Sequence, residues 1–335
     1  MPTNDMAVKE TITEETIAAE VAVKQTAVKT IPVNQVWTWG DVKETDITPS
    51  WVGGDGIFTE GTSADGAAVL RRVFTKESRP YASPFESIAT MMQIAGDVGI
   101  SPQVISVGDD DIIMRKLPGT WRNAKLDELR DPYVLWAVLE QHRRVHELAI
   151  PQGREVMERD LIEDVFGMRD LYRHTGKRMP RDVDRLLKRL DPFIRRVDEF
   201  HEPAVPCHGD GAASNVLLDP QIRPGDVAQP LLCGWTVSGV MDPLEEAGSV
   251  LSEVGPFCGV PSMLINGLGL PSSALPVAQV FGILGDLYWA LIGLWRSATT
   301  DTPQIDFAKY GLWRLVKASN QLLLPTGPAA WLDSL

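Results

Sequence analysis

The segment from Cys207 to Leu218 contains side chains that could transfer a phosphoryl group. Asp210 and Asn215 lie five residues apart, and the apolar run of residues 216–218 follows them. Phosphoryl transfer from ATP requires a carboxylate that accepts the proton of the attacking hydroxyl, and oxygen ligands for the magnesium ion that neutralises the phosphates. Asp210 suits the role of catalytic base, and Asn215 suits that of metal ligand. An ordinary turn, in which Asp and Asn act as turn formers, is the alternative interpretation.

A sheet-rich first lobe is expected before this loop, over residues 35–118. The apolar pattern predicts strands over residues 67–74, 103–107 and 111–114. Apolar residues at helical spacing predict one helix over residues 84–98. Such a lobe would supply one wall of a nucleotide site.

A glycine-rich turn at residues 52–58 precedes the first of these strands. Gly53 and Gly54 would let backbone amides approach a phosphate closely, and a basic residue on the next strand could hold that phosphate. A simple hairpin turn explains the same glycines, and for this cluster taken alone it is the favoured interpretation.

Residues 119–335 are expected to form a mostly helical second lobe, after a hinge at Pro118-Gly119. The fold class is therefore α+β and bilobal, with ATP between the lobes. Residues 1–34 form an N-terminal arm with no evident chemistry, and a protein partner that binds through it is a hypothesis. Helical spacing predicts helices over residues 131–149, 155–172, 181–201, 245–254, 275–298 and 305–323.

The composition restricts the class of partner and the compartment. The chain has 335 residues, of which 44% are hydrophobic and 23% charged, as in soluble globular proteins. Its formal net charge of -13 argues against nucleic acid as the main partner and suits a cationic small molecule. The cysteines, Cys207, Cys233 and Cys258, are widely spaced and predict neither disulfides nor a zinc site. No signal peptide and no membrane span is expected, so a cytoplasmic location is predicted.

The motif His208-x-Asp210 with Asn215 resembles the catalytic loop of small-molecule kinases. Over residues 52–325 the chain resembles the choline/ethanolamine kinase branch of the aminoglycoside phosphotransferase-like kinases, which have a protein-kinase-like fold. The resemblance implies ATP and Mg²⁺ as cofactors. Arg72 falls on the position of the strand Arg that binds phosphate, and Glu86 on that of the helix Glu that pairs with it. The segment from Met114 to Gly119 resembles the hinge that contacts the nucleotide.

The C-terminal part of the resemblance implies the acceptor. Residues 286–291, Asp306, Tyr310 and Arg314 are similar to the choline kinase tail, in which aromatic side chains surround a quaternary ammonium group. A cation over an aromatic face gains about 0.5–2 kcal/mol. Trp289 falls on the first aromatic position, with Tyr288 and Trp295 as further candidates. The second expected Trp is Ile292 here, and core packing of an apolar helix is the alternative explanation for the two tryptophans.

One position departs from the family pattern. The family carries a second metal-binding Asp after the catalytic loop, and the matching segment, residues 231–236, has Gly234 there. Loss of one preorganised electrostatic group costs roughly 10²–10³ in rate. Asp242 or Glu246, from the following segment, could replace the missing ligand.

Two functions remain open from the sequence. The first is an ATP-dependent kinase that phosphorylates a hydroxyl of a cationic amino alcohol. The second is a catalytically impaired pseudokinase that acts as a ligand-binding regulatory or scaffold subunit, because Gly234 cannot bind metal through a side chain. His142 and His146 have a spacing that zinc sites use, but no Glu follows His142 as the metalloprotease motif requires. Metal hydrolysis is therefore set aside.

Overall fold

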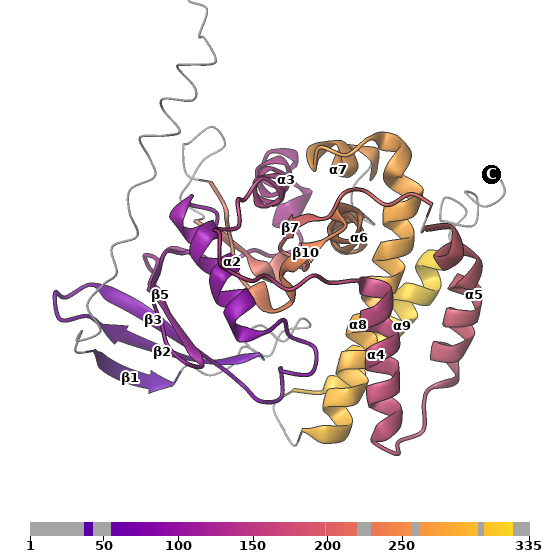
Figure 1. Ribbon diagram of the computed structural model, residues 1–335, viewed down its shortest axis with the longest axis horizontal. Helices are drawn as coiled ribbons and strands as arrows, with labels where there is room; N and C mark the ends of the chain where they lie inside the picture. The colour runs from indigo at the N-terminus through magenta and orange to yellow at the C-terminus, as the bar shows by residue number, and fades with distance from the viewer. Residues whose placement is uncertain are drawn as a thin grey trace, which may run out of the picture. The chain divides into compact units, whose positions relative to one another are not determined.

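A computed structural model describes residues 37–42, 55–197, 199–219, 229–255, 261–300 and 305–323. The predicted N-terminal arm, Gly53 and Gly54 lie outside these residues. Within them, an antiparallel sheet forms the N-terminal region and helices dominate the C-terminal region (Figure 1). The predicted α+β class is confirmed.

The N-terminal sheet has five strands in the order β1-β2-β3-β5-β4. The predicted strands and the predicted helix are present, with ends within one residue for the strands. The first two strands were not predicted from the sequence. The elements are β1 (Thr38–Val42), β2 (Gly56–Thr62), β3 (Ala68–Phe74), α2 (Phe85–Asp97), β4 (Val104–Val107) and β5 (Asp111–Arg115).

Strand β3 sends two neighbouring arginines to opposite faces of the sheet, because successive side chains alternate along a strand. Arg71 is half-buried and forms an ion pair with Asp111 of β5. Arg72 is buried, with only 4% of its surface exposed, and pairs in register with Phe58 and Ile112. The alternation therefore places one guanidinium inside the molecule.

Two short sheets hold the loop that carries Asp210 and Asn215. Strand β7 (Val205–Cys207) pairs antiparallel with β10 (Gly239–Met241) immediately before the loop. Strand β8 (Val216–Leu218) follows the loop and lies between β6 (Arg122–Asn123) and β9 (Leu231–Leu232). The predicted apolar strand after Asn215 is present. We call residues 208–215 the catalytic loop, after the role predicted for Asp210.

The C-terminal region contains the predicted helices and one helix that was not predicted, α7. The helix expected from residue 155 begins six residues later, because residues 155–160 are extended and Asp160 caps the helix by accepting the N–H groups of Ile162 and Glu163. The bounds are α3 (Pro132–His146), α4 (Leu161–His174), α5 (Arg181–Val197), α6 (Pro243–Val254), α7 (Pro261–Gly267), α8 (Leu275–Thr299) and α9 (Phe307–Leu322).

Helix α8 is the core element of the helical region. It packs against α4, α6 and α9, and glycines permit two of these contacts at backbone distance. A Cβ on Gly282 would lie 2.7 Å from the Gly248 carbonyl oxygen, and one on Gly293 would lie 2.9 Å from the Gly311 backbone. The segment Ser272–Thr299 is long and apolar enough to cross a membrane, but 89% of its most apolar window is buried inside the protein. Its apolar composition is thus explained by core packing.

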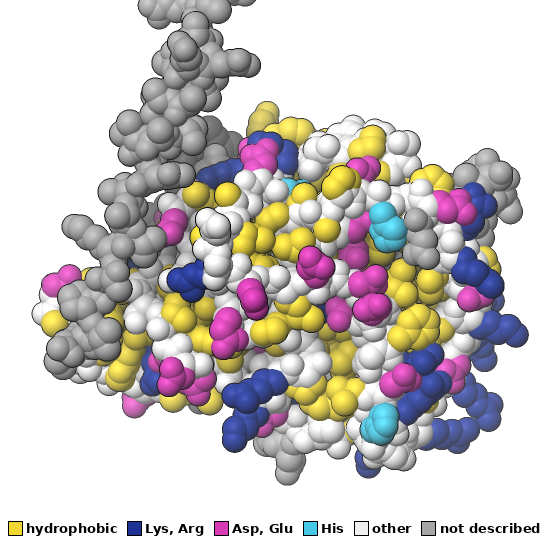
Figure 2. Space-filling view, viewed as in Figure 1, with side chains coloured by type: hydrophobic (Ala, Val, Ile, Leu, Met, Phe, Trp, Pro, Cys, Tyr) yellow, Lys and Arg dark blue, Asp and Glu magenta, His cyan; other side chains and the backbone are white. Residues whose placement is uncertain are grey.

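Helix α5 shows how the basic residues are distributed. Its apolar face is buried, and exposed arginines and lysines lie over it at the right edge of Figure 2. Several form surface ion pairs, such as Arg185 with Asp182 and Arg195 with Asp191, which contribute little to stability. Part of the cationic surface therefore lies on this outer helix.

Candidate active site

A cleft of about 700 Å³ separates the sheet from the catalytic loop and the helices behind it. Its size is that of a small-molecule site. Among the described residues it brings together most of those predicted from the sequence. These are Arg72, Met114, Asp210, Asn215, Gly234 and Trp289.

Asp210 lies half-buried in this cleft, at the turn of the catalytic loop. Its Oδ1 accepts the N–H of Ala212 at 3.1 Å, and the side chain of Asn215 also hydrogen-bonds to it. Burial raises the pKa of Asp210 to about 6, although the positive charge of Arg314 and these hydrogen bonds act in the opposite direction. A carboxylate with this pKa is ionised at neutral pH and is a stronger base than an exposed Asp.

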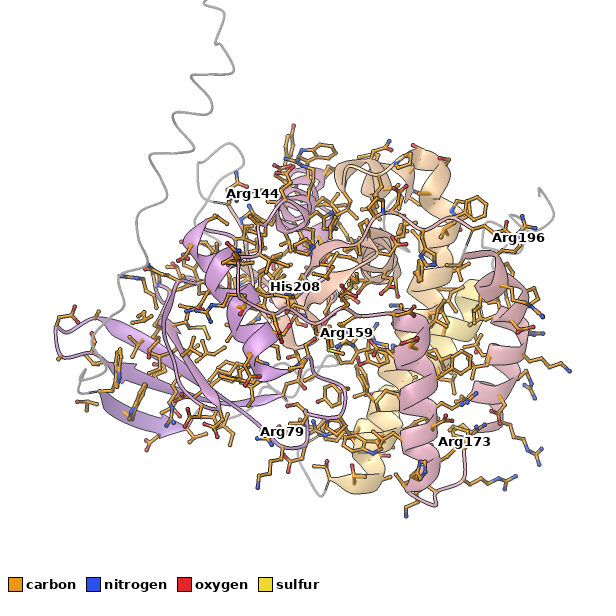
Figure 3. All side chains as sticks on the ribbon, in the orientation of Figure 1. Arg79, Arg144, Arg159, Arg173, Arg196 and His208 are labelled. Atoms are coloured by element: carbon orange, nitrogen blue, oxygen red, sulfur yellow. The ribbon has the colours of Figure 1, made fainter. Side chains whose placement is uncertain are left out.

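Glu246 of α6 holds the catalytic loop in place through hydrogen bonds to its backbone. It is fully buried, and its Oε1 accepts the N–H groups of His208 and Gly209 at 2.7 and 3.0 Å. His146 lies 2.5 Å from Oε2, and His142 lies 3.3 Å from Oε1. Burial favours the neutral acid, but the two histidines hold the pKa of Glu246 well below its usual value. Figure 3 shows His208 inside the molecule.

Asp242 and Glu246 do not replace the missing metal ligand, and this expectation is wrong. Asp242 caps α6 by accepting the N–H of Leu244 at 2.8 Å, and it also binds the Glu202 N–H and His201. Glu246 is occupied by the loop. Neither residue lines the cleft.

Both the backbone conformation at position 234 and the lack of space for a side chain favour glycine there. Its φ of 77° lies in the left-handed region, where a residue with a Cβ is strained. A Cβ at this position would lie 2.1 Å from Oδ1 of Asn215 and 2.5 Å from its Cγ. The amide of Asn215 therefore occupies the space that a side chain at position 234 would enter.

Arg72 reaches the cleft from β3, with its guanidinium carbon 4.2 Å from the Phe74 ring centroid and 5.8 Å from that of Phe58. Its Nη2 donates to Thr236 Oγ1 at 2.8 Å, and its buried Nε has no hydrogen-bond partner among the described residues. Burial lowers the pKa of Arg72. The incomplete hydrogen bonding of a buried cation marks it as a position for an anion.

Glu86 is not the partner of Arg72, contrary to the prediction. It lies exposed in the first turn of α2, whereas the neighbouring Ser87 faces the interior. Ser87 accepts the N–H of Met157 at 3.0 Å. The helix is thus rotated so that the acidic side chain points to solvent, and Thr236 contacts the guanidinium instead.

The predicted hinge lines the cleft from Met114 through Gly119. Met114 is buried on β5, and Lys116 donates its N–H to the Ala68 carbonyl oxygen at 3.1 Å. The predicted hinge therefore forms one edge of the cleft.

The opposite end of the cleft is formed by α8 and α9. Trp289 lines it, with 8% of its surface exposed. Tyr310 and Arg314 of α9 complete this wall, and Arg314 donates to the Tyr310 hydroxyl at 3.0 Å and to Asp286 at 2.7 Å.

Tyr288 and Trp295 do not line the cleft, so their assignment to the acceptor pocket is wrong. The Tyr288 hydroxyl donates to the Tyr81 carbonyl oxygen at 3.0 Å and accepts from Arg159 at 3.1 Å, and burial raises its pKa to about 12. Figure 3 shows Arg159 next to α4 and α8. Trp295 packs edge-on against Tyr81, with ring centroids 6.5 Å apart. The sequence placed all three aromatic residues on one helix, but only Trp289 faces the open space.

Asp55 and Arg314 are charged cleft residues to which the sequence assigned no individual role. Asp55, within the predicted glycine-rich turn, lines the cleft and accepts a hydrogen bond from the Tyr81 hydroxyl at 2.6 Å. Arg314 was recognised only as part of the C-terminal pattern. A charged residue between apolar helix positions was the available signal for Arg314, whereas the contact of Asp55 depends on the tertiary fold.

No protein-family model and no curated protein sequence matches this chain. Solved structures do. A choline/ethanolamine kinase family protein from Mesorhizobium loti is 18% identical in sequence, with a TM-score of 0.67. The match covers 95% of this chain and 98% of that protein. The choline kinase LicA from Streptococcus pneumoniae is 12% identical with a TM-score of 0.64, covering 92% and 97%, and LicA has also been solved in complex with AMP. A microcompartment-associated aminopropanol kinase is 13% identical with a TM-score of 0.60, covering 96% and 98%.

These similarities extend over nearly the whole length of each chain. They establish the protein-kinase-like fold that the sequence predicted, and at the level of fold they confirm the resemblance to choline/ethanolamine kinases.

Proposed function

We propose that this protein is a small-molecule kinase that transfers the γ-phosphoryl group of ATP to the hydroxyl of a cationic amino alcohol. The observation that carries the proposal is Asp210, a half-buried carboxylate with a pKa near 6, in a cleft shared with Asn215 and Arg72. Several neighbours with this fold are kinases of choline, ethanolamine or aminopropanol, and one of them was solved with AMP. Others are aminoglycoside phosphotransferases, solved with GDP.

The residues around Asp210 fit Mg-ATP with one metal ion. Asn215 offers an amide oxygen and Asp210 a carboxylate, and magnesium accepts a small number of such protein ligands when phosphates and water supply the others. The bound metal would neutralise charge on the phosphates. Arg72, with its unpaired Nε, would bind a phosphate oxygen, and the hinge at Met114 would contact the base.

Asp210 would act as the catalytic base. It would orient the acceptor hydroxyl and take its proton as the oxygen attacks the γ-phosphorus, a contribution that is typically 10²–10⁴-fold in rate. Glu246 keeps the loop in position through the His208 and Gly209 N–H groups, so the carboxylate is held before the substrate arrives. Trp289 supports the choice of a cation, because an indole face attracts ammonium groups.

A second candidate function rests on Gly234. Asp242 and Glu246 have other partners, and Asn215 fills the space beside Gly234. Among the described residues, no carboxylate therefore takes the place that the family pattern gives to the second metal-binding Asp. This favours a pseudokinase that binds nucleotide or amine without turnover, as a regulatory or scaffold subunit.

The test is transfer of γ-phosphate from Mg-ATP to a panel of amino alcohols. We expect turnover with at least one acceptor and a loss of 10²-fold or more in D210N. The exposed D109N variant serves as the matched control and should keep full activity. Folded protein that binds ATP but phosphorylates no acceptor would refute the kinase and leave the pseudokinase.

A further inference from the structure

A small compartment opens from the cleft next to Asp210, and we call it the side compartment. Ser249, Ser252 and Glu253 of α6 face Gly282, Gly285 and Asp286 of α8 across it. Four residues line both the side compartment and the cleft: Asp210, Ala212, Trp289 and Arg314. A molecule whose hydroxyl contacts Asp210 would therefore extend its other end into this compartment.

The side compartment exists because one helix position has no side chain. A Cβ built on Gly285 meets no atom within 4 Å, whereas one on Gly282, a turn earlier, would touch the Gly248 carbonyl oxygen at 2.7 Å. Gly282 thus allows the helices to pack, but packing does not require Gly285. Glycine in the middle of a helix costs about 1 kcal/mol relative to alanine. The open space at Gly285 is where a ligand group fits.

Most charges around the side compartment neutralise one another. Asp286 is 1% exposed and binds Arg314 at 2.7 Å and Lys317 at 3.3 Å. It also accepts from Ser252 at 2.6 Å and Gln321 at 3.0 Å. Asp286 and Arg314 therefore satisfy each other and offer little net charge to a ligand.

Glu253 is an acid of the side compartment that forms no ion pair among the described residues, although the charges of Arg314 and Lys317 act on it through space. Its Oε1 accepts the N–H of Ala213 at 3.2 Å, and within the described part of the chain its Oε2 has no hydrogen-bond partner. Ser249 accepts the N–H of Gly211 at 2.8 Å and keeps its own hydroxyl proton and a second lone pair. A ligand in the side compartment consequently meets a free carboxylate oxygen, a hydroxyl and the indole of Trp289.

The dimensions favour a small donor group. The free volume is about 10 Å³, close to that needed for one water-sized group. An –NH₃⁺ group has this size and three N–H donors, whereas a trimethylammonium group is larger and has none. A quaternary ammonium is held by aromatic faces, and Trp289 is the single aromatic residue among those that line the side compartment.

We propose that the side compartment binds the primary ammonium group of a short amino alcohol, with Glu253 as its counter-ion and Gly285 as the residue that admits it. The inference rests on the proposed function and specifies the acceptor as a primary amine of ethanolamine type. Each N-methyl group would remove one donor and would overfill the space.

The experiment uses ethanolamine, its N-methyl and N,N-dimethyl derivatives and choline as probes. Binding is measured by calorimetry in the presence of a non-hydrolysable ATP analogue, and phosphotransfer is measured separately with Mg-ATP. We expect affinity to fall along the series, by tenfold or more from ethanolamine to choline, on the order of one lost charge-assisted hydrogen bond.

Two variants test the residues. G285A should weaken ethanolamine binding at least fivefold, because its methyl group fills the compartment. The matched control is G167A, in the middle of α4, where a Cβ also meets nothing within 4 Å but faces solvent. E253Q keeps an acceptor for the Ala213 N–H. It should reduce the ratio of the affinity for ethanolamine to the affinity for choline. A purely structural role of Glu253 would leave this ratio unchanged.

The outcomes separate this inference from the proposed function. Choline bound or phosphorylated as well as ethanolamine would overturn the inference and leave the kinase intact. The predicted binding series without phosphotransfer would support the side compartment and refute the kinase. Binding of none of the four amines would overturn the inference, even if another hydroxyl acceptor were phosphorylated.

Discussion

The two walls of the cleft differ in how completely their buried polar groups are paired. On the helical wall, Asp286 receives hydrogen bonds from four side chains of α6 and α9. On the sheet wall, Arg72 is almost as deeply buried, yet in the described part of the chain it has one side-chain hydrogen bond, to Thr236, and its Nε has none. Burial of a polar group without a partner is costly. The helical wall is therefore complete by itself. On the sheet wall, Asp55 provides negative charge near Arg72, and we expect an anionic ligand to complete the pairing of the guanidinium.

The contrast extends to the catalytic loop, which lies between the walls. Its helical side is fixed by Glu246, which accepts two backbone N–H groups and contacts two histidines. Its other side faces Gly234, where the family pattern has a charged side chain. We therefore expect mutations on the sheet wall to impair mainly ligand binding and phosphotransfer, and mutations on the helical wall to impair mainly the stability of the fold. Mutations on the two walls should separate these effects.

The largest effect on stability is expected for D286A. Removal of one partner from a buried ion pair leaves Arg314 and Lys317 with uncompensated charge, which costs about 3–5 kcal/mol. Urea unfolding at constant pH measures it. The control is D170A on α4, an exposed residue whose ion pairs with Arg169 and Arg173 are worth about 0–1 kcal/mol. If D286A and D170A lowered the free energy of unfolding equally, the helical wall would not have the special importance for stability that the comparison assigns to it.

The next largest effect concerns Gly234. Because position 234 is left-handed and Asn215 fills the adjacent space, G234D should fail to raise phosphotransfer and should destabilise the protein by about 2–3 kcal/mol. G66A separates the two causes, since Gly66 has a φ of 86° but open space around it. We expect G234A to cost more than G66A, measured by thermal unfolding. A rise in activity with G234D would instead show that the missing carboxylate is the only defect.

A third prediction follows from the pKa of Asp210, which is raised from 3.8 to about 6. Turnover requires the ionised form, so kcat/KM should fall about tenfold per pH unit below pH 6. For stability the sign is opposite: the folded state binds the proton more tightly, so this contribution is lost as pH rises from about 4 through 6. D210N should therefore be more stable than the unchanged protein at pH 8, on the order of 1–2 kcal/mol after allowance for solvent screening, with no difference below pH 4.

The sequence predicted the fold and much of the site because both depend on local patterns. The β3 strand, the α2 helix and the catalytic loop follow from apolar periodicity and from the spacing of Asp210 and Asn215. The failures concern rotation about an element axis. Glu86 lies on the predicted helix but points to solvent, and Tyr288 lies beside Trp289 yet faces Tyr81. Neighbouring helix positions differ by 100° in direction, so the choice between them is made by packing partners distant in sequence.

The roles of Asp242 and Glu246 failed for a related reason. Asp242 precedes Pro243, a pattern typical of a helix start, and it caps α6. The sequence does not indicate that Glu246, one turn into the helix, holds the catalytic loop. The side compartment could not be predicted from the sequence either. An isolated glycine in an apolar helix can permit close packing or leave open space, and Gly282 and Gly285 do one each.

The smallest effect on stability, and the most informative about the sheet wall, is expected for R72M. Replacement of a buried cation by an apolar side chain of similar length removes one hydrogen bond to Thr236 and the cost of an unpaired Nε, so the two terms nearly cancel. We expect the free energy of unfolding without ligand to change by less than about 1 kcal/mol, whereas the increase in Tm caused by Mg-ATP should be lost. R71M is the control, since Arg71 points away from the cleft towards Asp111. If R72M destabilised the protein as strongly as D286A, Arg72 would be a structural residue and the sheet wall would not require a ligand for completion.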